Sequence, residues 1–335
     1  HVSSKNQQLD IVLRDGVELN EVNIVTRKLG TMKLRSSVMN EDMISSAELS
    51  RAACCNLGES FVTNPSVDVS YSDAATGAKQ IKLLGLSGTY VQMLTENIPN
   101  YRGAPAPYGL GYVPGPWMQS IQVSKGTSSV KNGYEAITGQ INVEFKKPQL
   151  PEADWVSANL FASTTNRYEA NADATLKLSK RWSTSLLAHY ENETKAHDGN
   201  DDGFVDIPQV EQYNVWNRWA YMGDHYVFQA GIKALSETRT SGQANHGGTM
   251  HSGDLYKVGI DTERYEFFTK NAYIFNKEKN TNLALILSTT LHNQDATYGR
   301  KLYNVDQTNV YASLMFETEF NPQNSFSAGS VSYTH

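Results

Sequence analysis

The segment DGNDDGFVDIPQ, residues 198–209, has the spacing of a calcium-binding loop. Its side-chain oxygen donors and its glycine fall at positions 1, 3, 5, 6 and 9 of an EF-hand loop: Asp198, Asn200, Asp202, Gly203 and Asp206. Phe204 stands where such a loop uses a backbone carbonyl, but position 12 is Gln209 instead of the bidentate glutamate. The pattern predicts either a structural Ca²⁺ site or an acidic, solvated loop. No other cofactor is expected.

A second set of residues could bind a soft metal. The segment HGGTMH supplies His246, Met250 and His251, and thiol and thioether groups occur elsewhere, at Cys54, Cys55, Met93 and Met118. Imidazole, thiolate and thioether ligands suit copper. The alternative is that the cysteines are simply buried, which is the more frequent state of a free cysteine.

No residue pattern indicates catalysis. The segment GTSSV lacks the G-x-S-x-G spacing of a nucleophile elbow, and the serine of residues 85–88 lacks the strand-to-helix context. His189 lies within a predicted strand, where a polar residue facing a lumen is expected. The sequence therefore predicts a protein that is not an enzyme.

Composition limits the partners. The chain carries 29 basic and 35 acidic residues, giving a net charge of −6, with no long block of either sign. Nucleic acid is therefore excluded as a partner, because phosphate binding needs a basic face. The two cysteines are adjacent, which places their Cα atoms about 3.8 Å apart, below the usual disulfide range. The sequence predicts no disulfide framework.

From about residue 155 apolar and polar residues alternate as in strands. In EANADATLKLS one face is apolar: Ala170, Ala172, Ala174, Leu176 and Leu178. The pattern recurs in VSANLFAS, STSLLAHY, QYNVWNRWAY, HYVFQAGIKAL, RYEFFTKNAYIF, NTNLALILSTTL, NVYASLMFETEF and FSAGSVSY. These segments predict about nine strands of about ten residues, the length that crosses a bilayer at a tilt.

The connections between these strands alternate in length. The short ones are SKRW, MGDH, NKEKN and NPQNS, and the long ones cover residues 192–211, 236–263 and 292–307. Outer-membrane barrels have short periplasmic turns and longer extracellular loops, whereas a soluble sandwich or propeller has no reason to keep this order. Trp155, Trp182 and Trp219 fall at the short-turn end, as an aromatic girdle predicts. We therefore predict a transmembrane β-barrel.

The first part of the chain differs in pattern. The segment SSAELSRAACCNLGESF predicts a short helix with Ser45 or Ser46 as N-cap and Glu48 in its first turn. Mixed strands and Gly/Pro-rich loops follow. We predict an N-terminal leader over residues 1–30, a small α+β domain over residues 31–150, and barrel strands over residues 151–335.

Four segments carry a family resemblance: ELNEVNIVTRK (18–28), ESFVTNPSVDVSY (59–71), KQIKLLGLSGTYVQMLTENIPN (79–100) and MQSIQVSKGTSSVKNGYEAITGQINVEFKKP (118–148). Together they resemble the TonB-box region and plug domain of TonB-dependent outer-membrane receptors, particularly those of Bacteroidota. The chain departs from the family pattern at Lys125, at Asn132-Gly133 and at Glu96-Asn97. In the last segment Gly126, Gly133 and Gly139 would permit tight turns and close backbone approach.

The resemblance implies an α+β plug domain followed by an antiparallel transmembrane β-barrel of about 22 strands, of which about nine are present here. Such a barrel lies in the bacterial outer membrane, in contact with lipid. Residues 21–26 would form the TonB box: Glu21, Val22, Asn23, Ile24, Val25 and Thr26. That segment would pair as an added β-strand with TonB, itself part of an inner-membrane energising complex. The alternative is a disordered leader.

The resemblance also places a ligand site on the outer side of the plug and in the outer loops. Its expected residues are Tyr71, Tyr101, Arg102, Tyr108, Tyr112, His246 and His251. Rings suit flat apolar surfaces and a guanidinium suits a carboxylate. The alternative is that these aromatic residues pack the plug against the barrel.

The implied function is active import of a scarce small nutrient: an iron chelate, haem, a corrinoid or a metal ion. A glycan or peptide importer with a surface lipoprotein partner is the alternative within the family. A passive porin or an adhesin is the alternative from a different class. Nine strands cannot close a bacterial barrel, which takes an even number, so we expect the chain to continue beyond this sequence.

Overall fold

The structure is a computed structural model. It describes residues 32–33, 40–51, 55–61, 64, 67–86, 88–127, 135–148, 156–244, 255–321 and 324–334. These residues form a small N-terminal domain, which we call the plug (residues 32–148), and a large sheet, which we call the wall (residues 156–334). The predicted fold class, an α+β plug followed by antiparallel strands, is confirmed.

The plug is built on a mixed sheet with strand order β1-β2-β7-β8-β5-β6. Its strands are β1 (Met32–Lys33), β2 (Asn40–Ser45), β5 (Val91–Thr95), β6 (Ile98–Pro99), β7 (Met118–Lys125) and β8 (Gly139–Phe145). A separate hairpin pairs β3 (Val67–Asp73) with β4 (Ala78–Leu83). The helices are α1 (Ser46–Arg51) and the 3₁₀ turns η1 (Leu57–Phe61), η2 (Gly88–Tyr90) and η3 (Gly115–Trp117). None of the helices that the structure describes is long and apolar enough to cross a membrane.

Strands β7 and β8 form the centre of the plug, because apolar side chains of both are buried. Gly126 ends β7 with a φ of +91°, a conformation that favours glycine. At Gly139 a Cβ atom would collide with the carbonyl oxygen of Ser124 on the paired strand. These two glycines therefore have the roles that the sequence predicts, while Gly133 lies outside the described residues.

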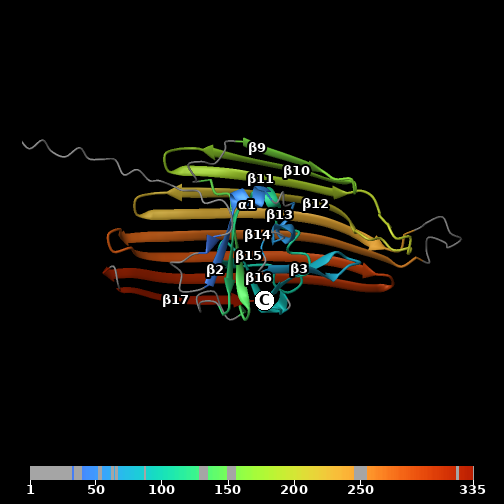
Figure 1. The fold of residues 1–335 in the computed structure, drawn as a ribbon. Helices are drawn as coiled ribbons and strands as arrows, with labels where there is room; N and C mark the ends of the chain where they lie inside the picture. Colours follow the sequence, from blue (N-terminus) through green and yellow to red (C-terminus); the bar gives the residue numbers. More distant parts are fainter. Residues whose placement is uncertain are drawn as a thin grey trace, which may run out of the picture.

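The wall is one antiparallel sheet of nine strands in sequence order. They are β9 (Val156–Ala162), β10 (Arg167–Lys177), β11 (Trp182–Glu193), β12 (Gln209–Met222), β13 (Tyr226–Gly242), β14 (Lys257–Asn276), β15 (Thr281–Tyr298), β16 (Lys301–Asn321) and β17 (Asn324–Thr334). Figure 1 shows them stacked as a curved wall from β9 at the top to β17 at the bottom, with plug elements α1, β2 and β3 in front of its middle. Hydrogen bonds join the two parts along β10 to β16.

The number of predicted strands is confirmed, but their predicted length is wrong. The described strands of the wall have between 7 and 21 residues, not about ten. The predicted long loop at residues 292–307 is also wrong, since β15 and β16 continue through it and turn at Gly299 and Arg300. Residues on β15 keep alternating between buried and exposed up to this turn, so the hairpin continues well past the apolar band.

The two faces of the wall differ as the alternation predicts. On β10 the alanines face outward, whereas Glu169 and Asn171 are buried toward the plug. His189 also faces inward, where its Nδ1 atom lies 2.8 Å from Oδ1 of Asn171. Lys146 at the end of the plug pairs with Asp173 at 2.8 Å. The polar face of the wall is therefore the face that holds the plug.

Aromatic residues form two rows on the outward face. Three pairs stand eight positions apart on their strands: Trp182 and Tyr190, Tyr213 and Tyr221, and Tyr265 and Tyr273. Neighbouring rings are in contact at both levels, with centroids 5.1 Å apart for Trp182 and Tyr221 and 4.9 Å apart for Tyr190 and Tyr213. Eight residues span about 26 Å along a strand at about 3.3 Å each. The apolar band of an outer-membrane barrel is about 25 Å tall along the membrane normal, and its strands are tilted, so the two rows lie within the height of such a band.

Candidate ligand-binding site

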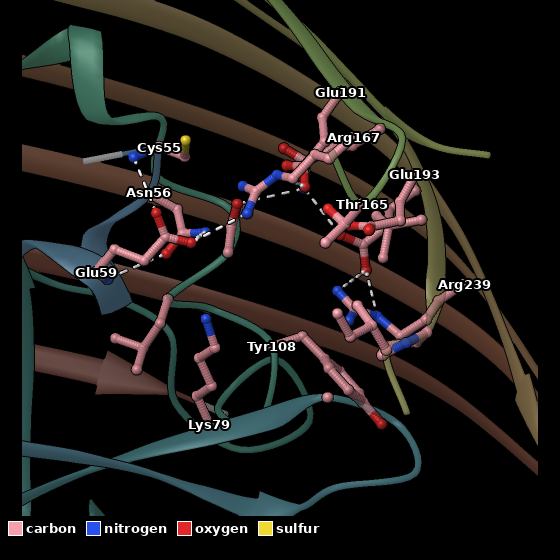
Figure 2. A pocket seen from close by; sticks show the side chains of 18 of the residues that line it. Cys55, Asn56, Glu59, Lys79, Tyr108, Thr165, Arg167, Glu191, Glu193 and Arg239 are labelled. Carbon is pink, nitrogen blue, oxygen red and sulfur yellow. Dashed lines mark hydrogen bonds and ion pairs between the residues drawn. The ribbon is translucent and has the colours of Figure 1, made fainter. Parts of the chain in front are cut away.

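A cavity of about 250 Å³ lies between the plug and the wall, at the end where the wall carries its long loops (Figure 2). Its charged and aromatic plug residues include Glu59, Tyr71, Lys79 and Tyr108. Its charged wall residues are Arg167, Glu191, Glu193, Glu237 and Arg239. Because the long loops are the predicted extracellular ones, this cavity lies on the side from which a ligand would arrive.

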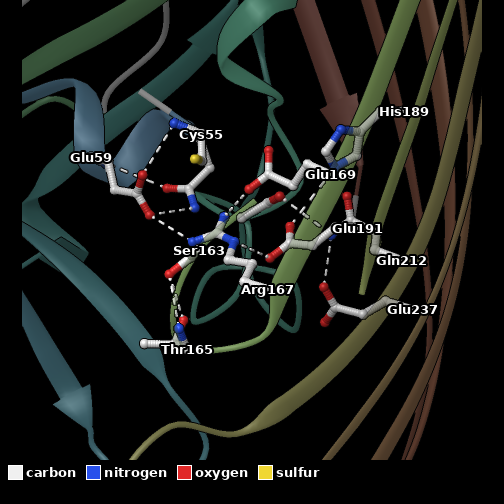
Figure 3. A network of polar contacts seen from close by, with 12 residues as sticks. Cys55, Glu59, Ser163, Thr165, Arg167, Glu169, His189, Glu191, Gln212 and Glu237 are labelled. Atoms are coloured by element: carbon white, nitrogen blue, oxygen red, sulfur yellow. Dashed lines mark hydrogen bonds and ion pairs between the residues drawn. The ribbon is translucent and has the colours of Figure 1, made fainter. Parts of the chain in front are cut away.

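Arg167, the first residue of β10, joins the plug to the wall (Figure 3). Its Nη1 atom lies 3.0 Å from Oε1 of Glu59 on the plug. Its other nitrogens pair within the wall, with Glu169 at 2.7 Å and with Glu191 at 3.0 Å. Glu59 also accepts hydrogen bonds from the backbone N–H of Cys55 and the amide of Asn56. One guanidinium thus contacts three carboxylates beside the cavity.

Arg239 on β13 forms the second paired cation of the cavity. It donates to Glu237 at 3.0 and 3.2 Å and to the carbonyl oxygen of Thr76 on the plug at 3.1 Å. Its guanidinium also lies 5.0 Å from the ring centroid of Tyr108. These contacts hold the β3–β4 hairpin and the loop after β6 against the wall.

Lys79 on β4 differs from these arginines. Within the described part of the chain its ammonium has no hydrogen bond or ion pair, and lies 5.5 Å from the ring centroid of Tyr71. Burial lowers the pKa of Lys79, although the carboxylate of Glu59 acts in the opposite direction. An ammonium in such surroundings is stabilised by any anion that enters the cavity.

A larger cavity of about 600 Å³ lies on another face of the plug, where Met93, Tyr101 and Arg102 contribute to its lining. The loop above it is fixed by Gln307 on β16. The side chain of Gln307 accepts from the backbone N–H of Ala104 and donates to the carbonyl oxygen of Arg102, both at 2.8 Å. The guanidinium of Arg102 pairs with Glu135 at 2.9 Å. This residue therefore already has a carboxylate partner.

Toward the short-turn end, a buried ion pair holds the β5–β6 turn of the plug. Glu96 accepts from Nη2 of Arg218 on β12 at 2.7 Å, and Lys270 on β14 lies 3.4 Å from its other oxygen. Arg218 also donates to the carbonyl oxygen of Lys146 at 2.7 Å. Burial would raise the pKa of Glu96, but the charges of Arg218, Lys270 and Lys147 together hold it below its ordinary value.

The predicted ligand residues of the plug have different surroundings. Tyr71 and Tyr108 both line the 250 Å³ cavity, whereas Tyr101 and Arg102 line the larger one. Tyr112 is fully buried, and its carbonyl oxygen accepts hydrogen bonds from the wall. Burial raises the pKa of both Tyr101 and Tyr112, and Tyr101 packs on wall cations. For these two residues the structure favours the alternative, packing of the plug against the wall.

Several predicted residues lie outside the described part of the chain. These are His246, Met250 and His251, Cys54, and the TonB-box residues 21–26. The remaining soft-metal candidates are not gathered in one site: Cys55 lines the smaller cavity, Met93 the larger, and Met118 is in the core. Burial raises the pKa of the Cys55 thiol, which disfavours the thiolate that a metal needs.

The sequence did not point to the charged residues of the cavity. Arg167, Glu193 and Arg239 line it and belong to no recognisable motif, whereas Glu59 begins the plug segment 59–71 but was not singled out there. For the three wall residues the available signal was their position on the polar face of the strands near the long-loop end. That signal applies to every inward polar residue there, so it could not select these three.

The predicted calcium loop has an ordered, self-contained geometry. Oδ1 and Oδ2 of Asp198 accept from the backbone N–H groups of Asp202 and Gly203, and Asp206 accepts from the N–H of Gly199. Asp202 accepts in turn from the N–H of Phe204. The described residues contain no group of three or more His, Cys, Asp or Glu side chains placed to hold a metal ion. The calcium site therefore stays a prediction.

Calcium binding by this loop can be measured directly. If the prediction holds, the receptor binds one Ca²⁺ with a dissociation constant of about 10⁻⁴–10⁻³ M, the range of extracellular sites. Asp198→Asn, which removes the first ligand, should abolish the binding heat in a calorimetric titration. Asp224→Asn, in a short turn at the opposite end, should leave it unchanged. Absence of any saturable binding heat in the unmodified protein would exclude the site.

Comparison with known proteins places the plug in a family. The family model of the TonB-dependent Receptor Plug Domain matches residues 33–140. This segment is a TonB-dependent receptor plug domain. Among curated proteins, none matches the chain.

Solved structures of TonB-dependent receptors have the same fold as the plug and the wall. The alcaligin outer-membrane receptor FauA from Bordetella pertussis is 11% identical, with 91% of this chain and 51% of that chain covered and a TM-score of 0.67. The ferric-catecholate import receptor Fiu from E. coli K12 is 15% identical, with coverages of 84% and 45% and a TM-score of 0.59. The copper transporter OprC is 12% identical, with coverages of 86% and 53% and a TM-score of 0.56.

The chain thus spans about half the length of these TonB-dependent receptors. Its nine strands correspond in fold to part of their barrels. The chain is a protein of the bacterial outer membrane.

Proposed function

We propose that the chain belongs to a receptor that imports a scarce small nutrient across the outer membrane, with energy supplied through TonB. The nutrient class is an iron chelate, haem, a corrinoid or a metal ion. The observation that carries this proposal is the cavity between plug and wall, at the predicted extracellular end. A ligand there would contact both parts of the protein at once.

The contacts around the plug support transport over a passive pore. Ion pairs join the plug to the wall at both ends, through Arg167 and Glu59 near the long loops and through Arg218 and Glu96 near the short turns. A plug held in this way closes the path along the wall. Passage of a solute then requires the plug to rearrange, and breaking such pairs requires work.

The proposed sequence of events uses both sets of contacts. A ligand in the cavity would alter the surroundings of Arg167 and Glu59, and so those of Cys55, whose backbone N–H donates to Glu59. The predicted TonB box, at residues 21–26, precedes Cys55 in the chain. Once bound to TonB as an added strand, it would transmit the force that displaces the plug.

Deletion of residues 21–26 tests this function. Uptake of ⁵⁵Fe-chelate, haem or cyanocobalamin by cells that depend on the full-length receptor should fall to the level of cells without it. Binding of the transported compound to the same cells on ice should remain, because the ligand cavity is distant in sequence from the deletion.

The alternatives give different results. A passive porin or an adhesin would keep its activity after the deletion. A glycan or peptide importer with a surface lipoprotein would lose its uptake but would accept none of the three nutrients.

A further inference from the structure

Two ionisable side chains of the 250 Å³ cavity form no ion pair among the described residues: Lys79 and Glu193. The other cations and carboxylates of its lining do. Arg167 contacts Glu59 and Glu191, and Arg239 contacts Glu237. The groups outside these ion pairs are thus one ammonium, from the plug, and one carboxyl group, from the wall.

One oxygen of the Glu193 carboxyl group is enclosed without a donor. Glu193 ends β11 and is only 6% exposed. The side chain of Thr165 hydrogen-bonds to its carboxyl group, but the Oε1 atom is buried without a partner. A buried carboxyl oxygen without a donor is costly, and structures generally supply one. The missing donor is therefore expected from a molecule that enters the cavity.

Lys79, in turn, has no hydrogen-bond acceptor for its ammonium group among the described residues. Its ammonium instead lies over the face of Tyr71. Burial lowers the pKa of Lys79 because the ammonium loses water, and the nearby carboxylate of Glu59 offsets this only in part. Lys79 and Glu193 do not neutralise each other, since no ion pair joins them. Figure 2 shows Lys79 extending from the plug side of the cavity and Glu193 lying on the wall side.

We propose that this cavity binds a zwitterionic part of the ligand, with a carboxylate at Lys79 and an ammonium group at Glu193. The ligand class is a metal chelate that presents such an amino-acid-like unit. The ring of Tyr108 and the side chain of Phe161 supply apolar surface in the lining of the same cavity. This inference deepens the proposed function and rests on it.

Three alanine dipeptides of nearly equal size test the proposal. They are L-Ala-L-Ala, which is zwitterionic, N-acetyl-L-Ala-L-Ala, which has only the carboxylate, and L-Ala-L-Ala-amide, which has only the ammonium group. Calorimetric titration of the full-length receptor should give the zwitterion at least about tenfold tighter binding than either capped form, the value of one charge-assisted hydrogen bond.

Two conservative variants should remove the two preferences separately. With Lys79→Gln the dipeptide and its amide should bind equally, whereas with Glu193→Gln the dipeptide and its acetylated form should bind equally. Lys82→Gln on the same plug strand and Glu211→Gln on the wall are the matched controls, because neither residue lines the cavity. Both controls should keep the full preference for the zwitterion. Unchanged reactivity of the Cys55 thiol shows that the plug of each variant is in place.

The proposal is overturned if the three probes bind the unmodified receptor equally or not at all. It is also overturned if both preferences survive in Lys79→Gln and Glu193→Gln. These results are separate from the test of import. If uptake requires residues 21–26 but the receptor shows no preference for the zwitterion, the proposed function still holds and only this inference fails. Zwitterion binding with uptake that is indifferent to that deletion would overturn the function alone.

Discussion

Glu96→Gln is expected to destabilise the docked plug by about 3–5 kcal/mol, the usual cost of removing one partner from a buried ion pair. The substitution keeps the shape of the side chain but leaves the guanidinium of Arg218 buried without its counter-charge. Lys270 loses the same carboxylate. The measurement is urea unfolding of the plug in the detergent-solubilised receptor, with amide hydrogen exchange of residues 91–99 as the local readout.

An exposed ion pair provides the control for this variant. Arg181 and Asp224 are 2.8 Å apart in the short turns, and both side chains are more than half exposed. Asp224→Asn should change the unfolding free energy by no more than about 0.5 kcal/mol. If Glu96→Gln has the same small effect, the buried pair does not hold the plug.

The same carboxyl group predicts how plug docking depends on pH. The pKa of Glu96 is lowered below its ordinary value of 4.5 in the folded protein, so its ionised form favours the docked state. This contribution is fully present above pH 4.5 and is lost as the pH falls through the lowered pKa. The difference in unfolding free energy between the unmodified protein and Glu96→Gln should therefore shrink below pH 4.5.

Arg167→Met is expected to have an effect of similar size, about 3–5 kcal/mol, at the opposite end of the plug. It removes the one cation shared by Glu59, Glu169 and Glu191 and leaves three carboxylates close together. Residues 55–61 of the plug should then detach from β10. Cys55 is now 7% exposed, so its alkylation by a maleimide in a Cys54→Ser background should accelerate by at least about tenfold.

Two further variants distinguish charge from geometry at this site. Arg167→Lys keeps a positive charge but cannot form three directed contacts at once, so its alkylation rate should be intermediate. Arg181→Met removes an exposed arginine and should leave the rate unchanged. Equal rates for Arg167→Met and Arg181→Met would show that Arg167 does not tie the plug to the wall.

The strands of the wall could be predicted because their alternation directly reflects two different environments. Ala170 and Ala172 face outward while Asn171 faces the plug, and the register with β11 keeps each face consistent. Strand length could not be predicted in the same way. Above the apolar band, β14 and β15 still bury Val258, Ile260 and Ala296, so their alternation continues beyond the membrane without a stop signal.

The candidate cavity involves residues that could be named from the sequence only in part. Tyr71 and Tyr108, which the resemblance proposes as ligand residues, are among its lining, and their role stays a prediction. The contact between Arg167 and Glu59 joins residues that are 108 positions apart, and no local pattern predicts such a pairing. The burial of Tyr112 could not be predicted either, because it depends on how closely β12 and β13 approach the loop that carries it.

The eight-residue spacing of the aromatic rows determines which bilayers fit the protein. With strands tilted by about 40°, a length of about 26 Å along the strand corresponds to a height of about 20 Å along the membrane normal. The hydrocarbon core of an average bilayer is about 30 Å thick. The bilayer must therefore thin around these strands, or the protein must lie in a thinner membrane. The resulting hydrophobic mismatch costs fractions of a kcal/mol per Å. Reconstitution should therefore succeed best in short-chain lipids, where the two rows coincide with the two interfaces.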